Sequence, residues 1–225
     1  MMFVFANTKG GVGKSTLAVH LAVWLHDQGR KTALLDADKQ GSSSSWIAEV
    51  EPEITVATTD SPEKCLSDAR GLARSHDFVI ADGPAGIDDL SRTLLILADV
   101  AVLPVTPSIL DVRSVQQAVA ILQYAQGINH GRPEGRLVLN KYRRRDTISR
   151  ELQAVAPKLG VRPTKHVIRD LQAYRDAAQQ ASVVTRMGRK TAHAAEEMTQ
   201  LFQELMRVRV RSPRKTPARR RVANG

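Results

Sequence analysis

The chain has 225 residues, of which 42% are hydrophobic, so it is long enough for one α/β domain with a substantial core. Its single cysteine, Cys65, excludes an intrachain disulfide and any metal site or iron–sulfur cluster that needs several cysteines of one chain. No apolar run approaches the ~20 residues of a membrane-spanning helix, and the first residues lack a secretory signal, so we expect a cytoplasmic protein.

The net charge of +10 is concentrated after Glu204, the last acidic residue. Eight basic residues follow it: Arg207, Arg209, Arg211, Arg214, Lys215, Arg219, Arg220 and Arg221. Without these eight, 25 of the 33 lysines and arginines remain, against 23 acidic residues. Residues 211–225 hold two prolines, many like charges and almost nothing apolar, so we expect a disordered basic tail after a domain spanning residues 1–210.

Along the chain, short apolar runs alternate with longer amphipathic segments. The expected strands are 2–6, 32–37, 54–58, 77–82, 100–105 and 136–140. The expected helices are 15–28, 42–50, 62–75, 89–98, 110–127 and 147–159, with two more near 170–180 and 191–207. Apolar runs with little polar alternation, separated by helices, are typical of parallel strands buried on both faces. The pattern therefore predicts a three-layer α/β sandwich on a doubly wound, mostly parallel sheet.

A glycine-rich loop lies between the first expected strand and the first expected helix. Its candidate nucleotide contacts are Lys9, Gly10, Gly11, Val12, Gly13, Lys14, Ser15 and Thr16. Glycines let backbone N–H groups approach a phosphate closely, and the start of the next helix adds its positive dipole end. Lys14 can reach the β- and γ-phosphates, and the Ser15 hydroxyl can ligate Mg²⁺.

The loop departs from the standard phosphate-loop pattern because Thr8 stands where the first glycine would fall, and Lys9 follows it. The string KGGVGKST resembles the deviant Walker A motif of the ParA/MinD family of ATPases, and the resemblance extends over about residues 2–205. It implies a P-loop NTPase fold, bound ATP and Mg²⁺, and catalytic roles for Lys9 and Lys14. It also implies that Lys9 reaches across a homodimer interface, formed on ATP binding, to the partner's nucleotide.

Three acidic residues follow expected strands. Asp36 and Asp38 resemble the family's D-x-D-P-Q motif, with Lys39 in place of the proline, which implies that Asp38 orients the attacking water and Asp36 supports the Mg²⁺ shell. Asp82 ends a buried strand in a Walker B arrangement, so we expect it to hold Mg²⁺ through water, together with Ser15. Residues 83–86 resemble the family's switch loop, which senses the γ-phosphate.

Asn140 is the candidate base reader because its amide can pair with the adenine edge, although it could equally be a turn residue after a strand. Arg143 stands where the aspartate of a GTPase N-K-x-D motif would be, which favours ATP over GTP. The segment 104–111 resembles the PVxPSxLD segment of ParA proteins.

Non-specific DNA binding is expected from two groups of basic residues. One group resembles the family region that contacts the nucleoid, or is simply a solvated face: Arg169, Arg186, Arg189 and Lys190. The other is the set of eight after Glu204, because a flexible polycation releases counterions on meeting phosphates. No helix-turn-helix precedes the phosphate loop, so site-specific binding is not expected. The resemblance implies a small, nucleoid-associated ParA-type ATPase that positions plasmid or chromosomal DNA, stimulated by a ParB-like or small centromere-binding partner.

Other functions remain open. A MinD-like protein would use a C-terminal amphipathic helix, with Leu201, Phe202, Leu205 and Met206 on one face, to associate with a membrane without stable insertion. A protein assembly could replace DNA as the cargo. A metabolic enzyme that phosphorylates a small molecule is disfavoured by Lys9, and a nitrogenase-type iron protein is excluded because one cysteine per subunit cannot supply a cluster.

Overall fold

The protein folds around one seven-stranded sheet. The computed structural model describes all residues except 87, 108, 144–153, 155 and 211–225. Its strands are β1 (Met2–Asn7), β2 (Thr32–Asp36), β3 (Thr55–Thr58), β4 (Phe78–Ala85), β5 (Val100–Val105), β6 (Glu134–Leu139) and β7 (Arg162–Pro163). The strand order is β3-β2-β4-β1-β5-β6-β7, and every pairing is parallel. The predicted doubly wound parallel sheet is confirmed.

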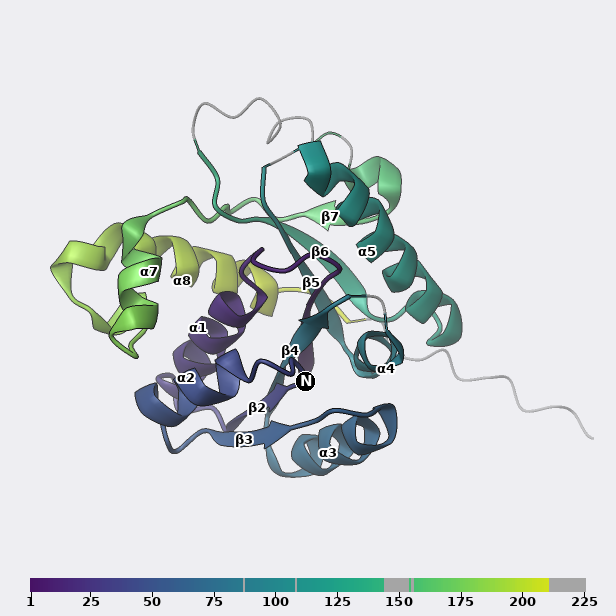
Figure 1. Ribbon diagram of the computed structural model, residues 1–225, viewed down its shortest axis with the longest axis horizontal. Helices are drawn as coiled ribbons and strands as arrows, with labels where there is room; N and C mark the ends of the chain where they lie inside the picture. The colour runs from purple at the N-terminus through teal and green to yellow at the C-terminus, as the bar shows by residue number, and fades with distance from the viewer. Residues whose placement is uncertain (87, 108, 144–153, 155, 211–225) are drawn as a thin grey trace, which may run out of the picture.

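Helices cover both faces of this sheet (Figure 1). On one face lie α1 (Lys14–His26), α2 (Ser42–Val50), α7 (Gln172–Gln179) and α8 (Ala192–Met206). On the other lie α3 (Pro62–Ser75), α4 (Asp89–Leu97) and α5 (Ile109–Ile128). Three short 3₁₀ helices complete the fold: η1 (Ala156–Leu159), η2 (Val184–Arg186) and η3 (Arg189–Thr191). Most of the expected helix 147–159 lies outside the described residues, as does the expected tail 211–225.

Two cores follow from the alternation of side chains along the strands. In β1, Phe3 and Phe5 are fully buried on the side of α1 and α8 and join Phe202 in one core. Val4 and Ala6 point to the opposite side and join the core under α3, α4 and α5. Every residue of β1, β2 and β5 is buried, as expected for inner strands covered on both faces.

β4 runs three residues beyond the predicted 77–82, so residues 83–85 of the expected switch loop belong to the strand. Gly83 lies so close to β1 that a Cβ atom there would be 2.7 Å from the Phe5 carbonyl oxygen. After an irregularity in β1, Asn7 pairs with Ala85. This tight pairing brings the ends of β1 and β4 together at the carboxyl edge of the sheet, where open α/β folds bind ligands.

Candidate functional site

The glycine-rich loop connects β1 to α1 and needs glycine at two places. Gly11 has a φ of 74° and Gly13 has a φ of 95°, which are left-handed conformations that side chains rarely adopt. Gly13 is the N-cap of α1 and provides no side-chain acceptor. The first N–H groups of α1 have no intrahelical partner and so form a binding site for an anion.

Side chains from the ends of β1 and β6 anchor this loop. Asn7 donates to the Pro104 carbonyl (2.7 Å) and accepts from the Lys9 N–H (3.0 Å). Asn140, just after β6, donates its amide to the Val12 carbonyl oxygen at 2.7 Å. The Lys141 ammonium donates to the Gly11 carbonyl at 2.8 Å. The role of Asn140 in reading the base stays a prediction, and its contact with the loop was not expected from the sequence.

Lys14 is buried beneath the loop but only weakly bonded. Its ammonium makes one long hydrogen bond, 3.4 Å, to the Lys9 carbonyl. Burial lowers the pKa of Lys14, while the charges of Asp82 and Asp38 oppose the shift. A buried ammonium with one weak partner is well placed to bind an anion in the cleft that it lines.

Lys9 occupies a different place from Lys14. It is half-buried and lines a hollow of about 310 Å³ with Thr106, Pro107 and Arg143, next to the loop. Among the described residues, Lys14 lines the main cleft and Lys9 does not. The two lysines of the loop therefore line different cavities: Lys14 lines the main cleft and Lys9 lines the neighbouring hollow.

Asp36 and Asp82 are partners in register on the neighbouring strands β2 and β4, and both are almost completely buried. The carboxylate of Asp36 is already used, since its oxygens accept from the N–H groups of Asp38 (3.0 Å) and Ser44 (2.8 Å). Asp36 thereby holds the turn after β2 and the start of α2. Its support of a Mg²⁺ shell stays a prediction.

Asp82 differs from Asp36 in its hydrogen bonding, because neither oxygen of the Asp82 carboxylate has a hydrogen-bond partner. Burial raises the pKa of Asp82 to about 6; the nearby hydroxyls of Ser15 and Ser43 partly offset the rise without making hydrogen bonds of ordinary geometry. Buried carboxylates normally have partners, so an orphaned one beside a serine hydroxyl fits a hydrated Mg²⁺ ion, which takes oxygen ligands. Ser15 and Asp82 are thus the residues whose placement best suits a metal.

Asp38 lies beyond the end of β2, in the turn that leads to α2. Its Oδ1 atom accepts from the Gln40 N–H at 3.0 Å, and its carbonyl accepts from the Gly41 N–H at 2.9 Å. The side chain is half-buried and lines the main cleft. The turn therefore holds this carboxylate at the mouth of the cleft while leaving it within reach of water.

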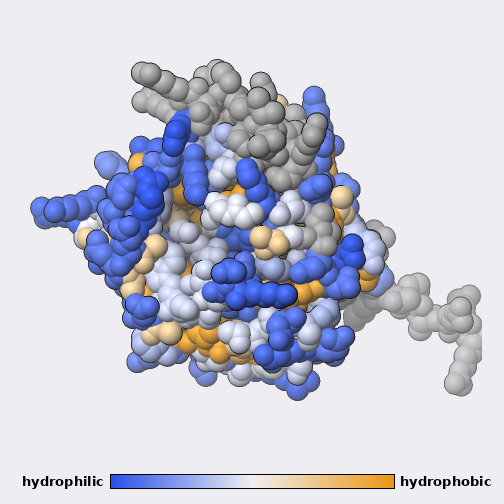
Figure 2. Space-filling view, viewed as in Figure 1, coloured by the Kyte–Doolittle hydropathy of each residue, from blue (hydrophilic) through white to orange (hydrophobic). Residues whose placement is uncertain are grey.

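The main cleft has a volume of about 1400 Å³. Figure 2 shows the face of the molecule seen in Figure 1, on which hydrophilic residues predominate. The phosphate loop and the start of α1 form one side, and Trp46 of α2 lies nearby. Residues 168–171 and Tyr174 form a further part of the wall, as does Asn140. This space is large enough for a nucleotide.

A buried histidine, His20 of α1, contacts two residues that line the cleft, Thr16 and Trp46. Its Nδ1 atom lies 2.7 Å from the Thr16 carbonyl oxygen, and its Nε2 atom accepts from the Val184 N–H at 3.2 Å. Burial lowers the pKa of His20 to about 4, so the ring is neutral with its proton on Nδ1. Trp46 packs edge-on against this ring and donates to the Ser182 carbonyl at 3.0 Å.

Those predicted DNA contacts that the structure describes do not form one patch, and two of them are ion-paired within the protein. Arg169 forms an ion pair with Glu197. Arg186 forms ion pairs with Asp27 and with Glu51, the latter at 2.7 Å, and also donates to the Val50 carbonyl. These contacts engage every nitrogen of the Arg186 guanidinium, whereas Arg169 uses only its Nε atom and its side chain stays 45% exposed.

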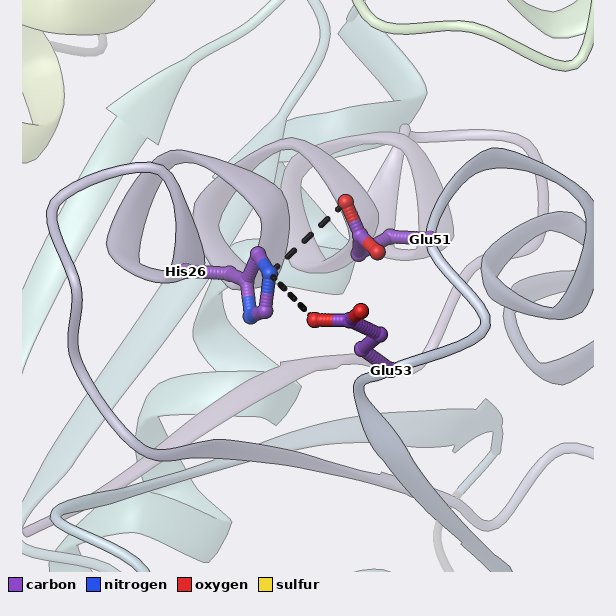
Figure 3. A group of neighbouring side chains, drawn as sticks. All are labelled: His26, Glu51 and Glu53. Carbon is purple, nitrogen blue, oxygen red and sulfur yellow. Dashed lines mark ion pairs between the residues drawn. The ribbon is translucent and has the colours of Figure 1, made fainter.

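The Arg186 network lies at the end of α1 away from the phosphate loop. Figure 3 shows Glu51 and Glu53 facing the His26 ring, at 3.7 and 3.8 Å from its Nε2 atom. The hydrogen bond from Arg186 lowers the pKa of Glu51. Together these groups tie η2 to the ends of α1 and α2.

The other described candidates are exposed at opposite ends of α8. Arg189 and Lys190 precede the helix, and Arg207 and Arg209 follow it. The helix has 15 residues, so about 22 Å separates the pairs. The remaining candidates lie outside the described residues: Arg211, Arg214, Lys215, Arg219, Arg220 and Arg221.

The apolar face of α8 packs inside the protein. Leu201, Phe202 and Leu205 are completely buried in the core beneath α1, and Met206 is partly buried. In the described part of the chain, no helix is both long and apolar enough to cross a membrane. The α8 residues considered for membrane contact are therefore already used in packing.

Comparisons with known proteins agree with this geometry. Residues 3–184 match the CobQ/CobB/MinD/ParA nucleotide binding domain. Maintenance of carboxysome distribution protein A from Halothiobacillus neapolitanus is 30% identical over 206 residues, which cover 89% of this chain and 94% of that protein. The protein of the same name from Gloeobacter kilaueensis is 28% identical over 192 residues, 84% of this chain and 86% of that one. A solved McdA–ATP complex from Cyanothece shares the fold, with a TM-score of 0.72 at 18% identity over 94% of this chain and 98% of that chain.

Proposed function

Since the chain belongs to the CobQ/CobB/MinD/ParA nucleotide-binding family, we propose that it is a Mg²⁺-dependent ATPase that works as a nucleotide-switched homodimer. The observation that carries this proposal is the pair of buried, poorly satisfied charges beneath the loop: the Lys14 ammonium and the Asp82 carboxylate. One suits a triphosphate and the other a metal. A solved relative is an ATP complex, which supports ATP as the nucleotide.

In this proposal the loop and the first N–H groups of α1 cradle the phosphates, and Lys14 donates to their oxygens. Mg²⁺, held by the Ser15 hydroxyl and through water by Asp82, would neutralise charge on the β- and γ-phosphates. The wall at 168–171 and Tyr174 faces the base. Each group acts from the place where the fold already holds it, so little reorganisation is needed on binding.

Lys9 supplies the second half of the switch. It lines a hollow apart from the cleft of its own subunit, which suits a cation that serves the partner's triphosphate. Two subunits facing each other would each donate one Lys9 ammonium to the other, so that the dimer forms only when both clefts hold ATP. Hydrolysis removes the charge of the γ-phosphate, which weakens the interaction between Lys9 and the partner's nucleotide and lets the dimer dissociate.

Asp38 is proposed to orient the attacking water. Replacement by alanine removes the carboxylate without touching the loop, so Asp38→Ala should bind ATP normally and hydrolyse it at least about 100-fold more slowly. Phosphate release under single-turnover conditions measures this rate. Asp60→Ala, which removes another carboxylate from the same cleft, is the control and should hydrolyse ATP normally. Hydrolysis by Asp38→Ala at the parental rate would refute the assignment.

The cargo is proposed to be a large intracellular assembly that the dimer positions along non-specifically bound DNA. The names of the two carboxysome-distribution relatives, which match most of both chains, support an assembly. The eight basic residues after Glu204 support DNA as the surface along which it moves. An adaptor protein on the cargo would stimulate hydrolysis, as a ParB-like partner would for plasmid or chromosomal DNA, the second candidate cargo.

Deleting the gene in the producing organism separates these two cargoes. Positioning of an assembly predicts clustered or unevenly inherited assemblies with normal plasmid and chromosome counts per cell. Loss of plasmids or cells without DNA would instead support partition. Fluorescence microscopy together with plasmid counting gives both readouts in one strain.

A further inference from the structure

We propose that Asn140 is a positioning residue for the phosphate loop and does not read the nucleotide base. The inference rests on the proposed nucleotide-binding function and concerns how the same site holds its ligand. It predicts that loss of this side chain weakens every ligand that needs the loop, whatever base that ligand carries.

The first support is the set of hydrogen bonds that Asn140 makes. Its Nδ2 atom donates to the Val12 carbonyl at 2.7 Å, in a buried contact. Its Oδ1 atom accepts from the Lys141 N–H at 3.0 Å. One N–H of the amide and one lone pair of its oxygen are therefore used within the protein, and the residue is only 5% exposed. A base-reading amide needs a donor and an acceptor directed into the cleft.

The second support is steric. A Cβ atom added at Gly13 would lie 2.1 Å from the Asn140 Nδ2 atom. The amide therefore rests directly against the last glycine of the loop, which is also the N-cap of α1. Val12 and Gly13, the two residues that Asn140 touches, immediately precede Lys14. The position of Asn140 therefore controls where the loop turns into the helix.

The third support is the neighbouring residue, Lys141, which has a φ of 55° and donates to the Gly11 carbonyl at 2.8 Å. A non-glycine residue in this left-handed region is uncommon. This backbone conformation after β6 allows two consecutive side chains to donate to consecutive carbonyls of the loop. Asn140 donates to the Val12 carbonyl and Lys141 donates to the Gly11 carbonyl. Because a trans peptide points its N–H opposite to its C=O, holding these carbonyls directs the N–H groups of Val12 and Gly13 away from Lys141 and Asn140.

The energetic consequence follows from the population of the binding-competent loop. Without the Asn140 amide, the buried Val12 carbonyl loses its partner and the loop gains other conformations. The apparent Kd then rises by the factor by which the competent fraction falls. That factor is a property of the loop and is common to all its ligands; for one missing hydrogen bond it is roughly tenfold.

The test compares ATP, GTP and inorganic tripolyphosphate binding to the full chain by calorimetry. We expect Asn140→Ala to raise the three Kd values by the same factor, roughly tenfold, with the ATP-to-GTP preference unchanged. Weaker ATP binding with unchanged tripolyphosphate binding, or a collapsed ATP-to-GTP preference, would overturn the inference. Absence of ATP binding by the unmodified chain would refute the proposed function itself, and the inference with it.

The matched control is Asn129→Ala. Asn129 also donates its side-chain amide to a carbonyl, that of Ile96 at 2.8 Å, but it does not line the cleft. Asn129→Ala should lower the thermal stability without changing any of the three Kd values. If Asn140 had a merely structural role, Asn140→Ala would likewise lower the stability and leave the three Kd values unchanged. If Asn140→Ala does not fold, Asn140→Ser, which keeps a shorter donor, provides the same comparison of ligands.

Discussion

At the scale of single residues, the site depends on charges that the fold buries before any ligand arrives. Lys14 is the first residue of α1 and Asp82 lies within β4, and each affects the pKa of the other. Burying ions without good partners costs stability. The protein sustains that cost at the one place where a triphosphate and its metal would offset it.

Lys14→Ala should therefore lose nucleotide binding, because the ammonium makes charge-assisted hydrogen bonds that no neighbour can replace. We expect the Kd for ATP to rise by about two orders of magnitude. The same change removes the positive charge that opposes the raised pKa of Asp82, so this pKa should rise further. Lys64→Ala, an exposed lysine of α3 outside the cleft, is the control and should bind ATP normally.

His20 gives the fold a defined pH dependence. Its pKa of about 4 in the folded protein lies below the ordinary histidine value of 6.5, so between these values the unfolded chain binds a proton that the folded chain does not. Stability due to His20 is complete above pH 6.5 and is lost as the pH falls toward 4, by about 3 kcal/mol. Asp82, with its raised pKa, acts in the opposite direction.

His20→Gln isolates this contribution, because the opposing effect of Asp82 is present in both proteins. The difference in unfolding free energy between the parent and the variant should shrink as the pH falls from about 7 to about 4. Urea unfolding at a series of pH values measures it. A constant difference across that range would show that His20 does not stay neutral in the fold.

At the scale of elements, polar contacts between distant segments decide which basic residues are available to a partner. Arg186 joins η2 to the ends of α1 and α2 through Asp27, Glu51 and the Val50 carbonyl. The resemblance suggested that this arginine contacts DNA. The network gives this arginine a structural task, and its assignment as a DNA contact stays an untested prediction.

Arg186→Ala should lower the free energy of unfolding by about 1 kcal/mol, since it breaks a partly exposed ion-pair network. It should leave the salt dependence of DNA binding unchanged. The double variant Arg189→Ala/Lys190→Ala is the comparison, because those exposed side chains should affect DNA binding and not stability. Thermal unfolding and salt-dependent binding assays on both proteins distinguish the two roles.

The sequence predicted the elements well because apolar runs and amphipathic periodicity are local features. The ends of α2 and α3 match the predicted 42–50 and 62–75, and Ser61 caps α3 as its serine–proline start favours. The short β7 was not predicted, because two residues carry no periodicity. β4 was predicted too short, because its extension depends on pairing with β1.

The candidate site was predictable where its chemistry is encoded in consecutive residues. The spacing of Gly11, Gly13 and Lys14, between an expected strand and an expected helix, predicts the phosphate loop, and its contacts with a nucleotide stay a prediction. The contact between Asn140 and Val12 joins residues 128 positions apart, and the contact between His20 and Val184 joins residues 164 apart. Such contacts depend on the strand order, and no pattern within one segment indicates them.

At the scale of the whole molecule, the charge is unevenly distributed. Eight of the 33 lysines and arginines follow Glu204, while the rest of the chain nearly balances its 23 acidic residues. The proposed nucleotide site at the carboxyl ends of the central strands is thus combined with a basic segment that follows α8. Pairing two chains would double the number of DNA phosphates that the basic segments can neutralise and raise the affinity for DNA steeply.

Removing residues 207–225 should weaken non-specific DNA binding and make its salt dependence shallower. The slope of log K against log salt changes by about 0.9 for each DNA phosphate that the protein no longer neutralises. Fluorescence anisotropy with duplex DNA at several salt concentrations measures this slope. A matched chain with the eight basic residues changed to glutamine should behave in the same way, whereas an unchanged slope would assign DNA binding to another surface.

The central claim is that ATP joins two copies of the chain through Lys9. Its most direct test is the molar mass of Asp38→Ala at micromolar concentration with ATP and Mg²⁺, measured by sedimentation velocity beside the double variant Asp38→Ala/Lys9→Ala. We expect a species of about twice 24.7 kDa for the first protein and a monomer that still binds ATP for the second. A monomeric Asp38→Ala protein saturated with ATP, or an undiminished dimer without Lys9, would contradict it.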